Sequence, residues 1–452
     1  MEKQYDVIII GFGKAGKTLA GMLAGQNKKV ALIEKSKDMY GGTCINVGCI
    51  PSKSLVNSAD HSYVLQQNGA NTKMLYQKAV QEKNRVTSML RDKNYHKLAD
   101  HENITIIDGR AEFTADHTIQ VITEKGTDVL RAEQIFINTG SVSVIAPIDG
   151  LKDNPIVYTS ETLMNLETLP EELVIIGGGY ISLEFASMYK KFGAQVTVVQ
   201  RDREFLPKED EDIAEAILSA LKEQGIRFCL DAQDIRVDRN KVNFGQNGTQ
   251  TELSADAILV ATGRRPNTDG LAAEKAGIDT GKRGEIKVDE YLRTSVPGIF
   301  AMGDVTGGSQ FTYASLDDFR IIRDQLLGKT DGYNRNKRKN LPYSVFMALP
   351  YARVGMNEKE AMAAELSYRV LKMPAAAIPK AQVLNKTKGI LKAVVEEKTG
   401  KVLGVMLLCE EAYEMINSVK TAMDFDVKAE YFKNQIYTHP TMTEALNDLF
   451  SL

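Results

Sequence analysis

Short apolar runs that end in glycines recur in the first half of the chain. Residues 5–10 read YDVIII, the glycines of GFGKAG follow, and the segment KTLAGMLAGQ leads to a second apolar run, VALIEK. Continuous apolar runs of this length are typical of buried strands, and the segment between them is expected to be a helix. The same order returns at 172–201, where ELVII, GGGYIS and VTVVQR follow one another. This internal repeat predicts an α/β fold with two nucleotide-binding domains.

Two other stretches depart from this pattern. Residues 55–100 look helical and polar on one face. After about residue 340, strand-like runs precede a helix near EAYEMINSVKTAMDF, which indicates a third domain of the α+β class. The segment 328–342 is rich in Asn, Lys and Arg and is interpreted as a solvated linker.

Composition narrows the classes of function. The chain has 452 residues, too many for one ordinary core, so two or three domains are expected. Its net charge of −3 indicates neither nucleic acid nor an anionic membrane as a partner. No apolar run is long enough for a signal peptide or a membrane span, so a cytoplasmic location is expected. Of the four cysteines, Cys229 and Cys409 lie in apolar runs and are interpreted as buried core thiols.

The stretch GFGKAGKT at 11–18 fits two phosphate-binding patterns. Read as G-x-x-x-x-G-K-[ST] it is a P-loop, and read as G-x-G-x-x-G it is a dinucleotide fingerprint. Glu34 closes the next strand at the distance expected of an acid that binds a ribose, and the second copy, GGGYIS, has no Lys-Ser or Lys-Thr pair. The dinucleotide interpretation is therefore favoured, and Lys17 and Thr18 become ordinary residues of the first helix.

Each glycine of this first loop has its own task. Gly11 permits the tight turn, Gly13 lets the backbone approach a pyrophosphate, and Gly16 lets helix and strand pack closely. The helix N-terminus adds unpaired N–H groups and a partial positive charge. The second loop starts at Gly177 and has Ser182 in place of the third glycine, which a small residue there tolerates.

The second loop also differs at the position that corresponds to Glu34. Gln200 stands there, followed by Arg201 and Arg203. A carboxylate would repel the 2′-phosphate of NADP, whereas guanidinium groups bind it well. We therefore predict NADPH in preference to NADH; two solvated arginines at a strand end are the alternative.

Cys44 and Cys49 form a C-x4-C pair immediately before Pro51. Proline is favoured at the first position of a helix, so a helix is predicted to start here. A thiol at a helix N-terminus has a lowered pKa, and Lys53 would lie on the same helix face as Cys49. Because no other cysteine or histidine is near the pair in the sequence, a redox pair is favoured and no metal site is predicted.

Together these motifs resemble the pyridine nucleotide–disulfide oxidoreductases, flavoenzymes such as glutathione reductase and lipoamide dehydrogenase. GGTCINVGCIPSK is similar to the redox disulfide of that family, and ATGRRPN, IFAMGD and HPTMTE are similar to its later signatures. The resemblance covers essentially the whole chain. Within the family, MYGGTCINVGCIPSK, DVTGGSQFTYASLDD, RKNLPYSVFM and HPTMTEALNDLFSL resemble the reactive-chlorine-resistance branch of bacterial flavoproteins, a branch also described as mercuric-reductase-like.

The resemblance implies three domains. Two Rossmann-like domains of the glutathione-reductase type would bind nucleotides, and a C-terminal α+β domain would dimerise. FAD would bind residues 1–145 and 269–335, and NADPH, with NADH as the alternative, would bind residues 146–268. Residues 336–452 would pair two subunits in a homodimer.

The resemblance also implies catalytic roles. Cys49 would lie against FAD and receive electrons, and Cys44 would attack the substrate. His439 of the partner subunit would exchange protons with Cys44, oriented by Glu444. Because Glu444 follows Thr441 by three residues, a capping box for the last helix is the alternative role of Glu444.

Further implied roles surround the cofactors. Lys53 and Glu184 would pair near the flavin, and Asp304 would hold its ribitol chain. The implied cofactor-binding residues are Gly11, Gly13, Gly16, Glu34, Lys35, Gly42, Thr43, Lys53, Thr139, Gly140, Gly177, Gly179, Tyr180, Ile181, Gln200, Arg201, Arg203, Gly263, Arg264, Gly303 and Asp304.

The resemblance suggests several substrates. Members of the reactive-chlorine-resistance branch reduce hypothiocyanous acid, and the Cys44 thiolate is suited to attack the sulfur of such a small oxidant. Reduction of copper(II) or of another metal ion, and reduction of a disulfide such as glutathione or lipoamide, remain open alternatives. A flavin-bound redox sensor or partner-binding scaffold without turnover is the alternative from a different class.

Overall fold

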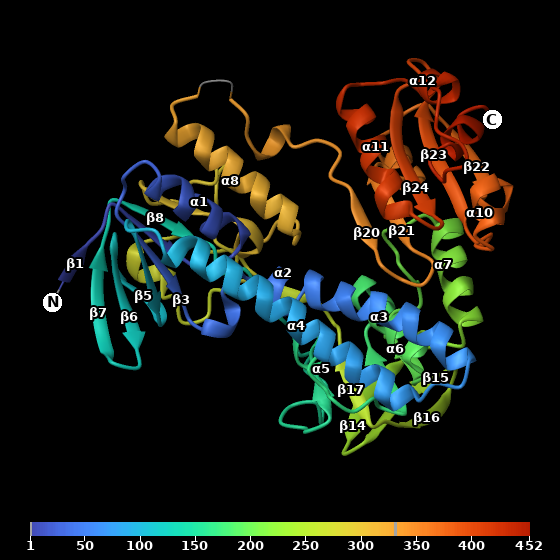
Figure 1. Ribbon diagram of the computed structural model, residues 1–452, viewed down its shortest axis with the longest axis horizontal. Helices are drawn as coiled ribbons and strands as arrows, with labels where there is room; N and C mark the ends of the chain where they lie inside the picture. Colours follow the sequence, from blue (N-terminus) through green and yellow to red (C-terminus); the bar gives the residue numbers. More distant parts are fainter. Residues whose placement is uncertain (1, 330–331) are drawn as a thin grey trace.

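Five parallel strands form the sheet that carries the first glycine loop. The computed structural model describes residues 2–329 and 332–452; Met1 and residues 330–331, which belong to the predicted linker, lie outside the described residues. The sheet has the order β19-β8-β2-β3-β4. The bounds are Val7–Ile10 for β2, Val30–Glu34 for β3, Ile104–Asp108 for β4, Gln134–Ile137 for β8 and Ile299–Ala301 for β19. Helices α1 (Lys14–Ala24) and α8 (Thr312–Leu326) pack side by side on it (Figure 1).

Smaller sheets flank this unit. A four-stranded sheet of order β1-β7-β6-β5 comprises Glu2–Gln4, Gly126–Arg131, Thr118–Thr123 and Arg110–Ala115. Strands β9 (Ser141–Ser143) and β18 (Arg264–Pro266) pair antiparallel where the chain leaves the first unit and returns to it. The first nucleotide unit is therefore discontinuous in sequence.

The second glycine loop lies at the carboxyl end of the central strand of another five-stranded parallel sheet. Its order is β10-β17-β11-β12-β13, with bounds Val157–Tyr158, Ala257–Val260, Glu172–Ile176, Gln195–Val199 and Arg227–Cys229. Helices α5, α6 and α7 comprise Ser160–Leu163, Tyr180–Phe192 and Glu211–Glu223, and an antiparallel sheet adds β14, β15 and β16 at Gln233–Asp238, Lys241–Gln246 and Thr249–Ser254. The predicted repeat of strand, glycine turn, helix and strand is confirmed, and Cys229 is buried as predicted.

The predicted helical region at 55–100 consists of two helices. Helix α3 spans Cys49–Gln67 and α4 spans Thr72–Ala99, and the break between them contains Gly69 at φ +82°. The Asn71 side chain accepts a hydrogen bond from the Met74 N–H group and caps α4. Helix α3 packs against both α4 and α6, so this pair connects the two nucleotide units (Figure 1). The dipeptide Asn68-Gly69 is typical of a turn, but the polar periodic pattern on both sides of it was interpreted as one helical region.

The C-terminal unit has the predicted α+β class. Its antiparallel sheet has the order β20-β21-β24-β23-β22, with bounds Tyr343–Val345, Tyr351–Gly355, Val402–Leu408, Ile390–Glu396 and Tyr368–Pro374. Helices α9 to α13 comprise Glu358–Ala363, Pro379–Val383, Ala412–Asp424, Ala429–Asn434 and Ala445–Leu449. Cys409 is buried in this unit, as predicted. Across the described residues, every helix is too short or too polar to cross a lipid bilayer.

A buried lysine of β23 ties this unit to the second nucleotide unit. Lys392 Nζ lies 2.7 Å from Asp210 Oδ2, 3.0 Å from Asp212 Oδ1 and 2.8 Å from Glu358 Oε2. Asp210 also accepts hydrogen bonds from the N–H groups of Glu358 and Lys359 at the start of α9. Since Asp210 precedes α7, one buried cation joins the N-termini of helices that belong to different units.

We predict that Lys392→Ala destabilises the protein by about 3–5 kcal/mol, because it leaves the buried Asp210 carboxylate, and the partly buried carboxylates of Asp212 and Glu358, without their cation. Unfolding in urea, followed by circular dichroism, measures the loss. Lys388→Ala is the matched control, since Lys388 pairs with Glu223 across the same two units but on the surface. A Lys392→Ala variant no less stable than Lys388→Ala would contradict the role of the buried cluster.

Candidate active site

The first glycine loop closes around Asn138, a residue that sequence reasoning missed. A Cβ atom at Gly11, which has φ +102°, would lie 2.3 Å from the Asn138 carbonyl oxygen, and one at Gly13 would lie 2.4 Å from Asn138 Oδ1. The same Oδ1 accepts a hydrogen bond of 3.0 Å from the Gly16 N–H group. Asn138 Nδ2 donates to the Met302 carbonyl at 2.7 Å. Close contacts with Asn138 therefore require glycine at positions 11 and 13, and Asn138 links the loop to the segment after β19. The approach of Gly13 to a pyrophosphate stays a prediction.

Glu34 lies beside this loop at the end of β3. Its carboxylate accepts hydrogen bonds from the Phe12 N–H group at 3.0 Å and from the Ser36 N–H group at 3.3 Å. Burial raises the pKa of Glu34, and these two hydrogen bonds oppose the rise. The carboxylate is thus fixed where the strand ends and where a ribose of a dinucleotide would reach the loop.

Two more polar groups face the same region. The Thr139 hydroxyl is buried and has no hydrogen-bond partner among the residues that the structure describes. The Asp304 carboxylate accepts a hydrogen bond of 2.7 Å from the Ser141 hydroxyl, and burial raises its pKa. A buried hydroxyl without a hydrogen-bond partner lowers the stability of the protein, so we expect the Thr139 hydroxyl to bond an atom of a ligand. Together with the glycine cradle and Glu34, these groups fit FAD.

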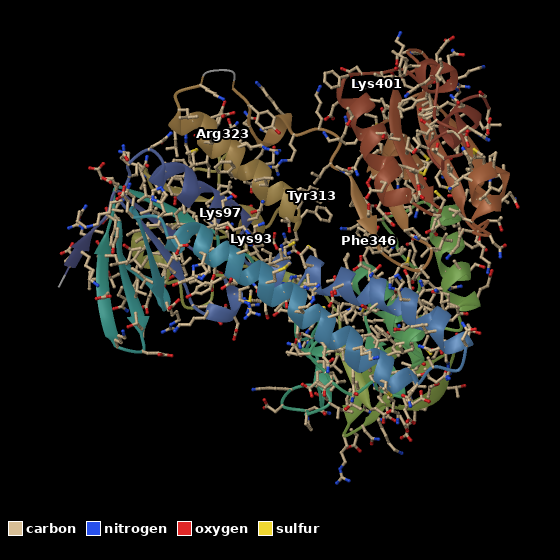
Figure 2. All side chains as sticks on the ribbon, viewed as in Figure 1. Lys93, Lys97, Tyr313, Arg323, Phe346 and Lys401 are labelled. Carbon is tan, nitrogen blue, oxygen red and sulfur yellow. The ribbon has the colours of Figure 1, made fainter. Side chains whose placement is uncertain are left out.

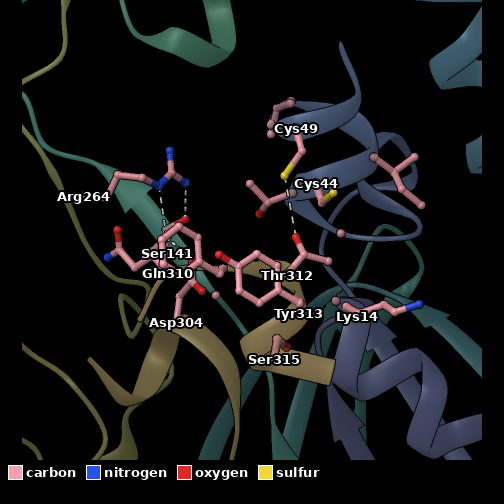
Figure 3. A pocket seen from close by; sticks show the side chains of 18 of the residues that line it. Lys14, Cys44, Cys49, Ser141, Arg264, Asp304, Gln310, Thr312, Tyr313 and Ser315 are labelled. Atoms are coloured by element: carbon pink, nitrogen blue, oxygen red, sulfur yellow. Dashed lines mark hydrogen bonds between the residues drawn. The ribbon is translucent and has the colours of Figure 1, made fainter. Parts of the chain in front are cut away.

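A cavity of about 2070 Å³ joins this cradle to the cysteine pair and to the start of α6. Figure 3 shows the part of the cavity between the cysteine pair and Asp304. The predicted site residues that line it are Gly11, Gly13, Glu34, Lys35, Gly42, Thr43, Cys44, Cys49, Lys53, Thr139, Gly140, Tyr180, Ile181, Glu184, Arg264 and Asp304. Those that lie outside its wall are Gly16, Gly177, Gly179, Gln200, Arg201, Arg203, Gly263, Gly303, His439 and Glu444. The chain therefore brings the first nucleotide loop and the redox pair together, but leaves His439 elsewhere.

Both cysteines of the pair are free thiols. Cys44 lies on the short helix α2 (Thr43–Asn46), and Cys49 is the first residue of α3, so this helix begins two residues before the predicted start at Pro51. The Cys49 sulfur lies 3.7 Å from the Thr312 hydroxyl at the start of α8 (Figure 3).

The pKa values of the two thiols are shifted in opposite directions. A hydrogen bond from Cys44 lowers the pKa of Cys49 to about 6; Thr312 and the Lys53 charge add to this, and burial opposes it. The same hydrogen bond and burial raise the pKa of Cys44. Cys49 is therefore the thiolate and Cys44 the proton carrier of the reduced pair at neutral pH.

Lys53 and Glu184 form the predicted pair. Lys53 Nζ donates to Glu184 Oε2 at 2.6 Å, and Glu184 Oε1 accepts a hydrogen bond of 2.9 Å from the Phe346 N–H group. The Lys53 ammonium also lies 4.7 Å from the centre of the Phe346 ring, which is labelled in Figure 2 at the junction of the C-terminal unit with the helices. This arrangement orders α3, α6 and the segment after β20 around one ion pair.

The second glycine loop is shaped by Gln200. A Cβ atom at Gly178 would lie 1.7 Å from Gln200 Oε1, whereas one at Gly179 would meet no described atom within 4 Å. Gln200 Nε2 donates hydrogen bonds to the carbonyls of Asp202 and Glu204, so the Gln200 amide group is already bonded within the protein. The loop therefore leaves open space at Gly179, where a nucleotide backbone would approach.

The two arginines after Gln200 remain at the surface. Arg201 Nε lies 3.1 Å from Asp202 Oδ1 in an exposed pair. Arg203 is exposed as well. Both guanidinium groups are therefore accessible beside the second glycine loop.

A buried carboxylate that sequence reasoning missed holds the start of α6. Glu209 accepts hydrogen bonds from the hydroxyls of Tyr180, Tyr343 and Tyr351, the last at 2.5 Å. Arg353 Nη1 lies 3.4 Å from Glu209 Oε2. Because these residues come from two units, only their pairing in space reveals the cluster.

His439 lies on the C-terminal unit, away from the cavity. Its side chain is 67% exposed, and its Nδ1 atom lies 2.8 Å from Glu444 Oε2. Glu444 also accepts a hydrogen bond from the Thr441 N–H group at 3.1 Å and donates its own N–H to the Thr441 hydroxyl at 3.3 Å. Thr441 and Glu444 thus exchange the reciprocal hydrogen bonds of a capping box, but they do not cap the last helix, because α13 begins at Ala445 with Glu444 itself at the N-cap position.

A dinucleotide cradle, a polarised dithiol and a second nucleotide loop define a flavin-dependent disulfide reductase. The chain belongs to the pyridine nucleotide–disulphide oxidoreductase family, whose model matches residues 5–318, and the dimerisation domain of that family matches residues 341–450. Members bind FAD and a pyridine nucleotide. The predicted fold class and the predicted class of enzyme are confirmed.

Several characterised proteins are similar along nearly the whole chain. The probable pyridine nucleotide-disulfide oxidoreductase RclA of Escherichia coli is 49% identical over 449 residues, covering 99% of each chain. A mercuric reductase of Lysinibacillus sphaericus is 34% identical, covering 98% of this chain and 82% of its own length. The solved Cu(II) complex of the HOCl-induced flavoprotein disulfide reductase RclA from Escherichia coli has a TM-score of 0.93 at 48% identity, covering 99% of each chain.

The acidity of Cys49 predicts a pH dependence. In the reduced protein we expect one thiolate above pH about 6, lost as the pH falls below the pKa of Cys49. Cys44→Ala removes the hydrogen bond that contributes most, so the Cys49 transition moves to higher pH. Ultraviolet absorbance of the thiolate, titrated against pH, measures both midpoints. An identical midpoint in wild type and Cys44→Ala would show that the sulfur–sulfur hydrogen bond is not the cause.

Proposed function

We propose that this protein is an NADPH-dependent FAD enzyme that reduces a small oxidant, first of all hypothiocyanous acid, with the Cys44–Cys49 pair. The observation that carries the proposal is the pair of oppositely polarised free thiols in one cavity with a cradle that fits FAD. Residues 1–145 and 269–335 would bind FAD, residues 146–268 the pyridine nucleotide, and residues 336–452 the partner subunit. The separate family model over residues 341–450 supports the boundary of the C-terminal domain.

FAD would lie on the loop of Gly11, Gly13 and Gly16. Glu34 would hold a ribose, Thr139 would gain the partner that its hydroxyl lacks, and Asp304 would hold the ribitol chain. When bound, FAD passes an electron pair from the reduced nicotinamide to the disulfide.

Two arguments favour hypothiocyanous acid as the oxidant: the reactivity of this molecule toward thiols, and the similarity of the chain to RclA, which is described as HOCl-induced. Its sulfur is electrophilic and carries hydroxide as a leaving group, so a thiol can attack it directly. The molecule is small and needs no dedicated groove, whereas glutathione or lipoamide would need one.

In the first step, Cys44 loses its proton and its sulfur attacks the sulfur of hypothiocyanous acid. The S–O bond breaks, and hydroxide leaves and takes up the proton as water. Cys44 then carries the thiocyanate group through a sulfur–sulfur bond. His439 of the partner subunit, oriented by Glu444, would act as the base for Cys44, which requires the homodimer.

In the second step, the Cys49 thiolate attacks the Cys44 sulfur. Thiocyanate leaves with the electron pair of the bond that breaks, and the Cys44–Cys49 disulfide forms. The hydride supplied by NADPH restores one thiolate and one thiol. The sum is NADPH plus HOSCN giving NADP⁺, thiocyanate and water, so electrons and protons balance.

Copper(II) is the second candidate substrate. The similar RclA was solved as a Cu(II) complex. In the described part of this chain, no group of three or more His, Cys, Asp and Glu side chains is arranged to hold a metal ion. Copper(II) would therefore meet the two thiols as a substrate rather than a resident metal.

We predict that the purified enzyme oxidises NADPH faster with hypothiocyanous acid than with oxidised glutathione, lipoamide or copper(II). Cys44→Ser lowers that rate by roughly a thousandfold or more, because the attacking sulfur is gone. Cys229→Ala, which changes a buried thiol away from the cavity, is the control and retains the rate. Absorbance of NADPH follows all four reactions. Full turnover by Cys44→Ser, or a preference for a disulfide, would refute the proposal.

We further predict that the Arg201→Ala, Arg203→Ala double variant raises the KM for NADPH by roughly tenfold or more, because two charge-assisted contacts to the 2′-phosphate are lost. The KM for NADH stays unchanged, which provides the internal control. Steady-state kinetics with both coenzymes measure the split. A wild-type enzyme with the lower KM for NADH would overturn the coenzyme assignment.

A further inference from the structure

Lys17, interpreted from the sequence as an ordinary helix residue, instead reaches the loop in front of Cys44. Its Nζ atom donates to the Gly41 carbonyl at 3.1 Å and to Asn94 Oδ1 at 2.7 Å. Both acceptors are neutral, and no carboxylate lies within ion-pair distance of Lys17 in the part of the chain that the structure describes. Lys17 and Cys44 line the same cavity.

The loop that Lys17 holds determines where Cys44 lies. Gly42 precedes α2 with φ +84°, and a Cβ atom at this position would lie 2.7 Å from the Gly13 Cα atom. The loop is therefore pressed against the first glycine loop on one side and bonded to Lys17 on the other. Cys44 follows two residues later, so its sulfur is fixed relative to both.

The electrostatics agree with this geometry. The pKa of Lys17 is lowered to about 8, chiefly by burial and also by the charges of Lys14 and Lys97, whereas Cys44 opposes this shift. The effect is mutual: the hydrogen bond to Cys49 and burial raise the pKa of Cys44, and the Lys17 charge is among the effects that lower it. Lys17 and a Cys44 thiolate therefore stabilise one another.

We propose that Lys17 is a positioning residue for the outer thiol, whose charge stabilises the Cys44 thiolate at the moment of attack. The proposal deepens the proposed function, since it rests on Cys44 as the attacking sulfur. Lys17, which occupies the lysine position of the P-loop pattern, would thus act on a sulfur and not on a phosphate. Its hydrogen bonds to Gly41 and Asn94 fix its ammonium group beside the loop that precedes Cys44. The cysteine pair needs such a charge, because the acidic sulfur is Cys49 while substrate meets Cys44.

The test isolates the titration of Cys44. In the FAD-loaded Cys49→Ser protein, Cys44 titrates without a coupled thiol. Alkylation of Cys44 by iodoacetamide, followed by peptide mass spectrometry across pH, gives its reactivity. Lys17→Gln keeps a hydrogen-bond donor but removes the charge, Lys17→Arg keeps the charge, and Lys93→Met removes an exposed lysine of α4, labelled in Figure 2.

We expect Lys17→Gln to slow alkylation at neutral pH roughly tenfold and to move the midpoint about one pH unit upward, as loss of a stabilising charge requires. Lys17→Arg and Lys93→Met keep the midpoint of the Cys49→Ser protein. An unchanged midpoint in Lys17→Gln, with FAD content retained, would overturn the proposal. The alkylation assay uses neither NADPH nor an oxidant, so it tests the role of Lys17 even if the proposed reduction of hypothiocyanous acid is wrong. If Lys17→Gln loses only FAD or thermal stability while the midpoint stays, the residue has a structural role alone and the proposal is wrong.

Discussion

The active site depends on one proton between two sulfurs. Because the interaction between the two thiols lowers the pKa of Cys49 and raises that of Cys44, the negative charge of the reduced pair stays on Cys49. The Thr312 hydroxyl and the Lys53 charge reinforce this, and burial works against it. The pair is therefore asymmetric before any substrate arrives. One sulfur is prepared to exchange electrons inside the protein, and the other retains a proton until a base or a nearby charge helps to remove it.

This asymmetry requires parts of the chain that are distant in sequence. Thr312 reaches Cys49 from the start of α8, and Lys53 is held by Glu184 on α6. The second oxygen of Glu184 is occupied by the Phe346 amide of the C-terminal region. One carboxylate thus joins three segments, and a movement of any of them would change the charge near the redox pair.

Local patterns predicted the features that neighbouring residues determine. The glycine loops and the Cys44–Cys49 pair are short motifs in which backbone geometry and chemistry depend on adjacent residues, so the sequence alone located them. Asn138 could not be found in this way, because it contacts Gly16 across 122 positions of sequence and looks like any polar residue after a strand. The break at Asn68-Gly69 was missed because the polar periodic pattern on both sides outweighed a turn signal of only two residues.

Long-range polar contacts explain why the remaining part of the site was not foreseen and why it is well defined. The fully buried Glu209 carboxylate bonds three tyrosine hydroxyls from two units, and the buried Lys392 meets carboxylates of both. An apolar junction would tolerate small shifts, because hydrophobic contact is not directional. Buried charged groups do not tolerate such shifts, because a shift separates them from their partners and each lost partner costs several kcal/mol of stability, on the order of 3–5. We infer that these junctions trade some stability for a single docking geometry. That geometry is what a redox centre assembled from several segments needs, because an ångström of displacement would separate the sulfur pair from the groups that polarise it.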